Sequence, residues 1–395
     1  MASSSTAKKK GLFTMNPVIL VLGFVSLFTD LSSNMIVPIL PLYLTAVLHV
    51  SVGSIGIIEG IAESTASVLK LFSGWITDRL GKYKLLMLIG YGLSNITKPL
   101  FALSGSWSQV LLIRFSDRIG KGIRTSPRDV LVADSTTKEE RGKAFGFRRA
   151  MDALGAALGP LAAFGILAIY EGNYRLVFWL SVIPGVLAVV LIIFFLKEKH
   201  RINIEKQDNL PQIGFKNLNR RVIMFSLIST LFTIGNFSDA FLALRAQDLG
   251  MLPAFIPLAF FALNISSSIF SMPIGMLSDR IGRRPVLISG FFIFAMIYFG
   301  FGIVKNVSLL WILFVLYGLY YAFTDGIQKA YIADIVPEGQ RGIAMGTYNA
   351  LTGFAALPAS VLAGFLWQTF GPMVAFSTSS GIAIIAAILM MILRI

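Results

Sequence analysis

Long apolar runs separated by short polar segments extend along almost the whole chain. Each run has about 20 residues or more, which is the length an α-helix needs to cross the hydrocarbon core of a bilayer. The pattern predicts twelve helices, at about 16–43, 53–77, 84–104, 107–131, 143–169, 175–196, 221–245, 253–277, 285–304, 308–334, 342–369 and 372–394. We therefore expect an all-α membrane protein with twelve transmembrane helices.

The longest polar stretch follows the sixth apolar run and divides the chain into two sets of six helices. We expect a cytoplasmic tail at 1–15, a six-helix bundle at 16–196, a cytoplasmic linker at 197–220 and a second six-helix bundle at 221–395.

Two polar motifs each occur twice, once in each predicted half. The first consists of Gly74, Asp78, Arg79 and Gly81, and it recurs 201 positions later as Gly275, Asp279, Arg280 and Gly282. The second has Ala-Asp at 133–134 and Arg-Gly at 141–142, and it recurs 200 positions later. Two independent motifs at nearly one spacing indicate duplicated, pseudo-symmetric six-helix units.

The basic residues between the apolar runs predict the orientation. Most lie in the tail, in the loops after the second and eighth runs and in the linker, whereas the opposite loops hold only Arg175, Arg245 and Lys305. Because loops rich in Lys and Arg stay in the cytoplasm, both termini are expected there. The first run is too long for a signal peptide, and the compact loops favour a bacterial inner membrane.

Composition narrows the function classes. The chain has 55% hydrophobic and 14% charged residues, no Cys and two His, so disulfides, cysteine-ligated metals and histidine-rich catalytic sites are not expected. The net charge of +14 comes from small clusters between apolar runs, which fits membrane topology better than nucleic-acid binding. We expect no enzyme activity, no cofactor and no metal site.

At the repeated loop motif the chain resembles the major facilitator superfamily, whose signature joins helices 2 and 3. In the fifth predicted helix, Gly146, Gly155, Gly159 and Pro160 resemble the motif of that superfamily's drug/proton antiporters. That motif usually closes with two glycines, where this chain has Ala163-Phe164. The resemblance implies two pseudo-symmetric bundles that form a secondary transporter.

Both motifs also have a physical interpretation. The Asp78 and Asp279 carboxylates are expected to meet a helix N-terminus or an arginine and to close the cytoplasmic side. The glycines permit close helix approach and Pro160 bends its helix, which suits a helix that rocks against a partner in the other half. The alternative for these glycines is ordinary packing of small residues.

The fourth predicted helix carries a stripe of cations. Arg114, Arg118, Lys121 and Arg128 share one helical face. Each central charge costs about 2.5–3.5 kcal/mol in lipid, so the stripe must face a wet cavity or carboxylates. Arg118 with Gly122 also resembles the superfamily's helix 4 motif. Arg114, Arg118 and Lys121 are therefore candidate ligands for an anionic group of a substrate.

Carboxylates at similar depth are candidates for proton coupling. Asp30 is our first choice because it lies in a polar break of helix 1, and Glu63 is the second, ahead of Glu59 and Asp152. Two interpretations remain open. The carboxylates, with Asp117, either neutralise the cations in a static network or exchange protons during transport.

The second half is less charged. Its inward polar residues include Asp239 and Asp325 as further coupling candidates, although Asp325 and Lys329 are spaced to pair with each other. Substrate contacts are expected at Asn34, Asn236, Asn264, Tyr321 and Asn349. An aromatic wall is expected from Phe232, Phe237, Tyr317, Tyr320, Tyr321 and Tyr348. Such a cavity suits an anionic or amphiphilic small molecule.

These features favour a secondary active transporter that acts as a monomer in the lipid bilayer, driven by the proton gradient through alternating access of 16–196 against 221–394. No G-x-x-x-x-G-K-[ST] sequence for ATP is present. The helix 5 motif favours export by antiport. The helix 4 cations favour the alternative, proton-coupled import of an organic anion or metal chelate. A transporter-like receptor or passive lipid translocator is the alternative from another class.

Overall fold

The computed structural model describes residues 15–137, 140–196, 218–337 and 340–393. Most of the predicted tail and linker lie outside this range, with all of their basic residues except Arg220, which begins α8. The described residues form fourteen helices. Those of the first half are α1 (Pro17–Ile36), α2 (Leu40–Ala46), α3 (Val52–Leu80), α4 (Tyr83–Leu103), α5 (Trp107–Asp134), α6 (Arg141–Ile169) and α7 (Tyr174–Phe195).

The second half repeats this order. Its helices are α8 (Arg220–Gly235), α9 (Ala240–Asp248), α10 (Phe255–Ile281), α11 (Arg283–Ile303), α12 (Val307–Ile335), α13 (Arg341–Phe370) and α14 (Pro372–Ile392). The all-α membrane fold predicted from the apolar pattern is confirmed.

Fourteen helices arise from twelve predicted spans because the first and seventh spans are each broken. The break between α1 and α2 contains Pro38, which cannot donate a backbone hydrogen bond. The break between α8 and α9 lies at Asn236–Asp239, where the Ser238 amide instead donates to Ser360 Oγ at 3.3 Å. The polar break that the sequence suggested around Asp30 is wrong in position, because α1 is continuous through residues 29–34 and the chain breaks only at 37–39, beside Pro38. The break at 236–239 was not expected.

Eleven of the described segments are long and apolar enough to cross a membrane, counting α1 with α2 and α8 with α9. The twelfth, α5, is 28 residues long but is absent from that set. It carries the predicted stripe of cations, and it packs against α3 and α4. Its charges therefore meet protein rather than lipid.

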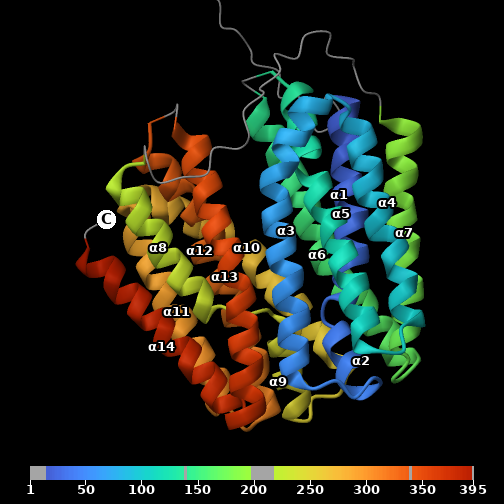
Figure 1. Cartoon of the computed structure of the whole chain (residues 1–395), viewed down its shortest axis with the longest axis vertical. Coiled ribbons are helices and arrows are strands. Elements are labelled where there is room, and N and C mark those ends of the chain that lie inside the picture. Colours follow the sequence, from blue (N-terminus) through green and yellow to red (C-terminus); the bar gives the residue numbers. More distant parts are fainter. Residues whose placement is uncertain (1–14, 138–139, 197–217, 338–339, 394–395) are drawn as a thin grey trace, which may run out of the picture.

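The helices gather into two groups, α1 to α7 and α8 to α14 (Figure 1). Three pairs of helices connect the groups. The pairs α3 with α13 and α6 with α10 are related by the repeat, and α2 pairs with its own counterpart α9. The groups lie close together at the end that carries α2 and α9, and they diverge toward the end where α7 finishes and α8 begins (Figure 1).

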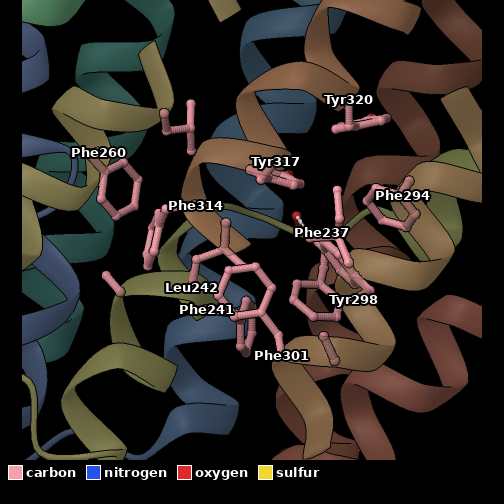
Figure 2. Close-up of a cluster of buried hydrophobic side chains, with 14 of the residues drawn as sticks. Phe237, Phe241, Leu242, Phe260, Phe294, Tyr298, Phe301, Phe314, Tyr317 and Tyr320 are labelled. Atoms are coloured by element: carbon pink, nitrogen blue, oxygen red, sulfur yellow. Dashed lines mark hydrogen bonds between the residues drawn. The ribbon is translucent and has the colours of Figure 1, made fainter. Parts of the chain in front are cut away.

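The second half has a core rich in aromatic rings (Figure 2). The rings of Phe237, Tyr298 and Phe376 pack at centroid distances of 5.0–5.4 Å. Most of the residues predicted to form an aromatic cavity wall, Phe232, Tyr317, Tyr320 and Tyr348, are buried in this core. The expected wall is thus largely packing, because apolar rings are more favourably buried among helices than exposed to a wet cavity.

Candidate functional site: a charged cavity between the halves

A cavity of about 360 Å³ lies between the two halves. It is lined by α1, α3 and α5 of the first half, and by the α8–α9 break, α12 and α13 of the second. Its charged lining residues are Asp30, Glu59, Glu63, Arg114, Asp117, Arg118, Lys121, Arg124 and Asp239. Most of the charges predicted within the membrane therefore converge on one site.

Two of the predicted cations are paired with α3. The buried Arg114 forms two hydrogen bonds to Glu59, at 3.2 and 3.1 Å, and Arg118 lies 2.8 Å from Glu63. Glu59 also accepts a hydrogen bond from Ser238 of the second half, at 3.2 Å. The geometry of these residues agrees with the interpretation that the carboxylates neutralise the cations in a static network.

The pairing is incomplete further along α5. Lys121 is exposed on the cavity wall, and its ammonium has no hydrogen bond or ion pair with any described residue. Nε of Arg118 is buried and lacks a hydrogen-bond partner in the described part of the chain. Arg124, in contrast, donates to Ser94 at 2.8 Å and lies 4.6 Å from the Tyr91 ring centre.

Asp30 lines the cavity from α1 without an ion pair to any described cation. Its helix is held against α6 by Gly155 and Gly159. A Cβ at Gly159 would lie 2.6 Å from the Leu31 carbonyl oxygen, and one at Gly155 would collide with the Leu27 carbonyl oxygen. The close approach expected of these glycines is present, but it is to α1 in the same half rather than to a helix of the other half.

The other residues of the helix 5 motif contribute differently. A Cβ at Gly146 would meet no atom within 4 Å, so that glycine is not needed for packing. Pro160 is buried within α6, one residue after Gly159.

Asp152 lies beside a neighbouring cavity of about 320 Å³. One oxygen accepts from Arg148 at 2.8 Å, whereas the buried Oδ1 has no hydrogen-bond partner among the described residues. Asp30 lines this second cavity too. The Asp30 and Asp152 carboxylates therefore line the same second cavity.

Asp239 is placed by the α8–α9 break and is held by tyrosines of α12. Its carboxylate accepts hydrogen bonds from Tyr317 at 2.8 Å and from Tyr321 at 3.0 Å. Asn236, from the same break, donates to Tyr320 at 2.9 Å. No described Lys or Arg forms an ion pair with Asp239, and the side-chain hydrogen bonds to its carboxylate come from tyrosine hydroxyl groups.

The predicted polar contacts are divided between cavity and packing. Asn34, Asn236 and Tyr321 line the central cavity. Asn264 lines the second one and donates to the Ala156 carbonyl of α6 at 3.1 Å, so it also joins the halves. Asn349 lines neither of these two cavities.

Asp325 forms the expected pair with Lys329, at 3.0 Å. It also accepts from Arg149 of α6 at 2.8 Å, which makes an ion pair across the two halves. The pair escaped notice because its members are 176 positions apart, and the sequence does not place α6 against α12.

The repeated loop motif ends α3 and α10 with glycines at positive φ, +60° at Gly81 and +92° at Gly282. Asp279 pairs with Arg283 at 3.0 Å, which is the arginine contact that was expected. In the first half, Arg79 lies 5.3 Å from the Trp75 ring, while the side chain of Asp78 is outside the described residues. Gly74, Gly275 and Arg280 lie in the same helix ends, and Arg280 is exposed.

Sequence reasoning overlooked two buried cations. Lys98 of α4 is 2% exposed and donates to Ser32 of α1. Lys98 lies in the middle of the apolar run 84–104, whose other charge, Lys84, is its first residue, so a mid-run charge offered a signal. Arg245, counted as an outside loop residue, is instead buried in α9 and donates to the Phe301 and Val304 carbonyls, at 2.9 and 2.8 Å.

Two pseudo-symmetric helix bundles around a charged central cavity define a membrane transporter fold. The sequence matches the Major Facilitator Superfamily over residues 22–244 and again over 223–395. This chain belongs to that superfamily, whose members are generally transporters rather than enzymes.

Relatives and solved structures agree. The chain is 37% identical over 377 residues to the MFS-type transporter MJ1317 of Methanocaldococcus jannaschii, covering 94% of this chain and 93% of that one. It is 25% identical over 261 residues to the quinolone resistance protein NorA of Staphylococcus aureus, covering 65% and 66%. The nucleoside transporter NupG has a similar fold, with a TM-score of 0.74 at 14% identity, covering 95% of this chain and 98% of that one.

Proposed function

We propose that the chain is a proton-coupled secondary transporter that exports a small organic solute by antiport. The observation that carries the proposal is the unpaired Asp30 carboxylate in the cavity between the halves. A membrane-embedded carboxylate without a cation partner is poised to bind and release a proton. The proton gradient then serves as the energy source, with no cofactor required.

The position of Asp30 supports coupling. Gly155 and Gly159 bring α6 against α1 at Asp30 and Asn34, so a change at the carboxylate bears directly on α6. α6 in turn contacts α10 of the other half. Proton binding is therefore linked through one packed helix to the relative position of the halves.

Export is favoured by the helix 5 motif and by the similarity to a quinolone resistance protein. We further propose a cytoplasmic-membrane location, a monomer and cytoplasmic termini, so that the diverging end of the bundles faces the cytoplasm. The alternative is proton-coupled import of an organic anion or metal chelate. The free Lys121 ammonium on the cavity wall favours that alternative.

The test is proton movement in proteoliposomes that contain a trapped pH-sensitive dye. A panel of organic cations, anions and amphoteric compounds, with quinolones included, is added to vesicles at a fixed pH gradient. For an antiporter, an active compound moves against the proton flux and dissipates the gradient. Asp30→Asn should abolish this response, and the exposed Glu171→Gln should retain it.

Two results would contradict the proposal. Full solute-driven proton movement in Asp30→Asn would remove Asp30 from coupling. Protons and solute moving in the same direction would replace antiport with the import alternative.

A further inference from the structure

Four charged residues of the cavity lining form no ion pair with a described residue, namely Asp30, Lys121, Arg124 and Asp239. Arg124 is held by Ser94 and the Tyr91 ring, and Asp30 is assigned to proton coupling, which leaves two opposite charges in different halves. One is the Lys121 ammonium of α5, in the first half. The other is the Asp239 carboxylate of the α8–α9 break, in the second half. Both line the same cavity of about 360 Å³, and they form no ion pair with each other.

The first wall is prepared for an anionic group. Lys121 offers an ammonium with no partner among the described residues. Next to it on the same helical face, Arg118 uses one terminal nitrogen for Glu63, and its buried Nε–H is unsatisfied. A buried donor without a partner is costly, so an anion that accepts from Arg118 and Lys121 would remove that cost.

The second wall is prepared for a cationic group. Tyr317 and Tyr321 donate to Asp239 and fix the orientation of its carboxylate. A carboxylate has about four acceptor positions, so two hydroxyl groups leave capacity for another donor. Glu59 of α3 lies on the opposite wall and accepts from Ser238, the residue before Asp239, but its carboxylate is already paired with Arg114.

We propose that the transported solute is zwitterionic, with its anionic group at Lys121 and Arg118 and its ammonium at Asp239. This inference rests on the proposed transport function and specifies its substrate class. The cavity volume is within the range of about 300–1,000 Å³ usual for small-molecule sites. Val37 and Phe237 supply apolar lining for the body of the solute.

The arrangement gives specificity because the two charges belong to different halves. A solute with one charge would leave the opposite residue unpaired in a partly desolvated site, which is unfavourable. Only a solute with both charges joins the first half to the second through ionic contacts. Asp30 also lines the cavity, but it forms no ion pair with Lys121 that would substitute for the anion.

The test is equilibrium binding to the purified full-length protein by calorimetry. The probes are phenylalanine, para-aminomethylbenzoate and para-aminoethylbenzoate, in which the two charges are increasingly separated. Each is compared with its methyl ester, which keeps only the cation, and its N-acetyl derivative, which keeps only the anion. At least one zwitterion should bind at least about tenfold more tightly than both derivatives.

Two variants test the assignment of each charge. Lys121→Gln should remove the preference for the zwitterion over its ester, and Asp239→Asn should remove the preference over the N-acetyl derivative. Lys121→Arg, which keeps the positive charge, should retain the preference for the zwitterion over its ester. This variant separates charge recognition from a folding defect. The exposed Lys305→Gln and Glu171→Gln are controls that should bind like the original protein.

The proposal is overturned if no zwitterion of the panel binds, if the derivatives bind equally well, or if neither variant changes the preference. Such a result leaves proton-coupled transport intact when another solute drives proton movement in the vesicle assay. Failure of every compound in that assay would instead contradict the proposed function itself.

Discussion

Glu59 shows how one residue serves both halves of the molecule. Arg114 binds its carboxylate in the first half, and Ser238 reaches the same oxygen from the second. Glu59 is 4% exposed and Arg114 is 5% exposed, so neither charge has much access to water. Each charge of the pair is therefore neutralised by the other, and the loss of one member leaves a buried charge without a counter-charge.

Replacing Arg114 by Gln should lower the free energy of unfolding by about 3–5 kcal/mol, because Glu59 loses its counter-charge. Thermal unfolding of the detergent-solubilised protein measures the change. The double variant Arg114→Gln/Glu59→Gln should recover a large part of the loss. Arg175→Gln, at an exposed position, is the matched control. Equal stability of the single variant and the control would show that Glu59 does not depend on Arg114.

At the scale of elements, the glycines of α6 differ in whether they contact another helix. A Cβ at Gly159 would press on the backbone of α1, whereas one at Gly165 would have no atom within 4 Å. Because both glycines lie in the same helix, replacing either by Ala changes helix propensity by the same amount. A difference between the two substitutions therefore reports packing against α1.

Gly159→Ala should destabilise the protein by about 1–3 kcal/mol through overpacking against α1, and it should reduce transport because Asp30 and Asn34 move. Gly165→Ala should be neutral or slightly stabilising, since alanine favours the helix. Unfolding temperature and solute-driven proton movement are compared for the two variants. Tolerance of Gly159→Ala in both measurements would mean that α1 and α6 are not tightly coupled.

The sequence predicts elements well and their mutual placement poorly. The period of the α5 cations and the high cost of charge in lipid lead directly to carboxylate partners, which α3 supplies. The α8–α9 break was missed because Asn236, Ser238 and Asp239 interrupt an apolar run without a proline. Arg149–Asp325 was missed because it depends on the packing of the halves, which no local pattern encodes.

For the whole molecule, Arg149–Asp325 joins the halves toward the end where they diverge, and Thr45–Gln247, at 2.9 Å, joins α2 to α9 at the opposite end. Alternating access requires such contacts to break and form in turn. The Arg149 and Asp325 side chains are 63% and 48% exposed, so the pair contributes about 1 kcal/mol or less to stability. A small contribution suits a contact that opens and closes in the proposed transport cycle.

Arg149→Ala should leave the unfolding temperature nearly unchanged and increase access to the cavity from the diverging end. The chain has no cysteine, so Ser33→Cys on the cavity wall gives a single reporter. Its reaction with a membrane-impermeant maleimide should become severalfold faster in the Arg149→Ala background. Arg175→Ala serves as the control, and an unchanged rate would remove Arg149–Asp325 from gating.

The charge content of α5 also bears on how the protein is assembled. A helix with so many cations partitions poorly into lipid alone, and within the chain α3, which carries Glu59 and Glu63, is synthesised before it. Membrane insertion of α5 is thus expected to await its acidic neighbour. The order of the helices along the chain then favours correct insertion, because the acidic helix α3 has already been made when the basic helix α5 leaves the ribosome.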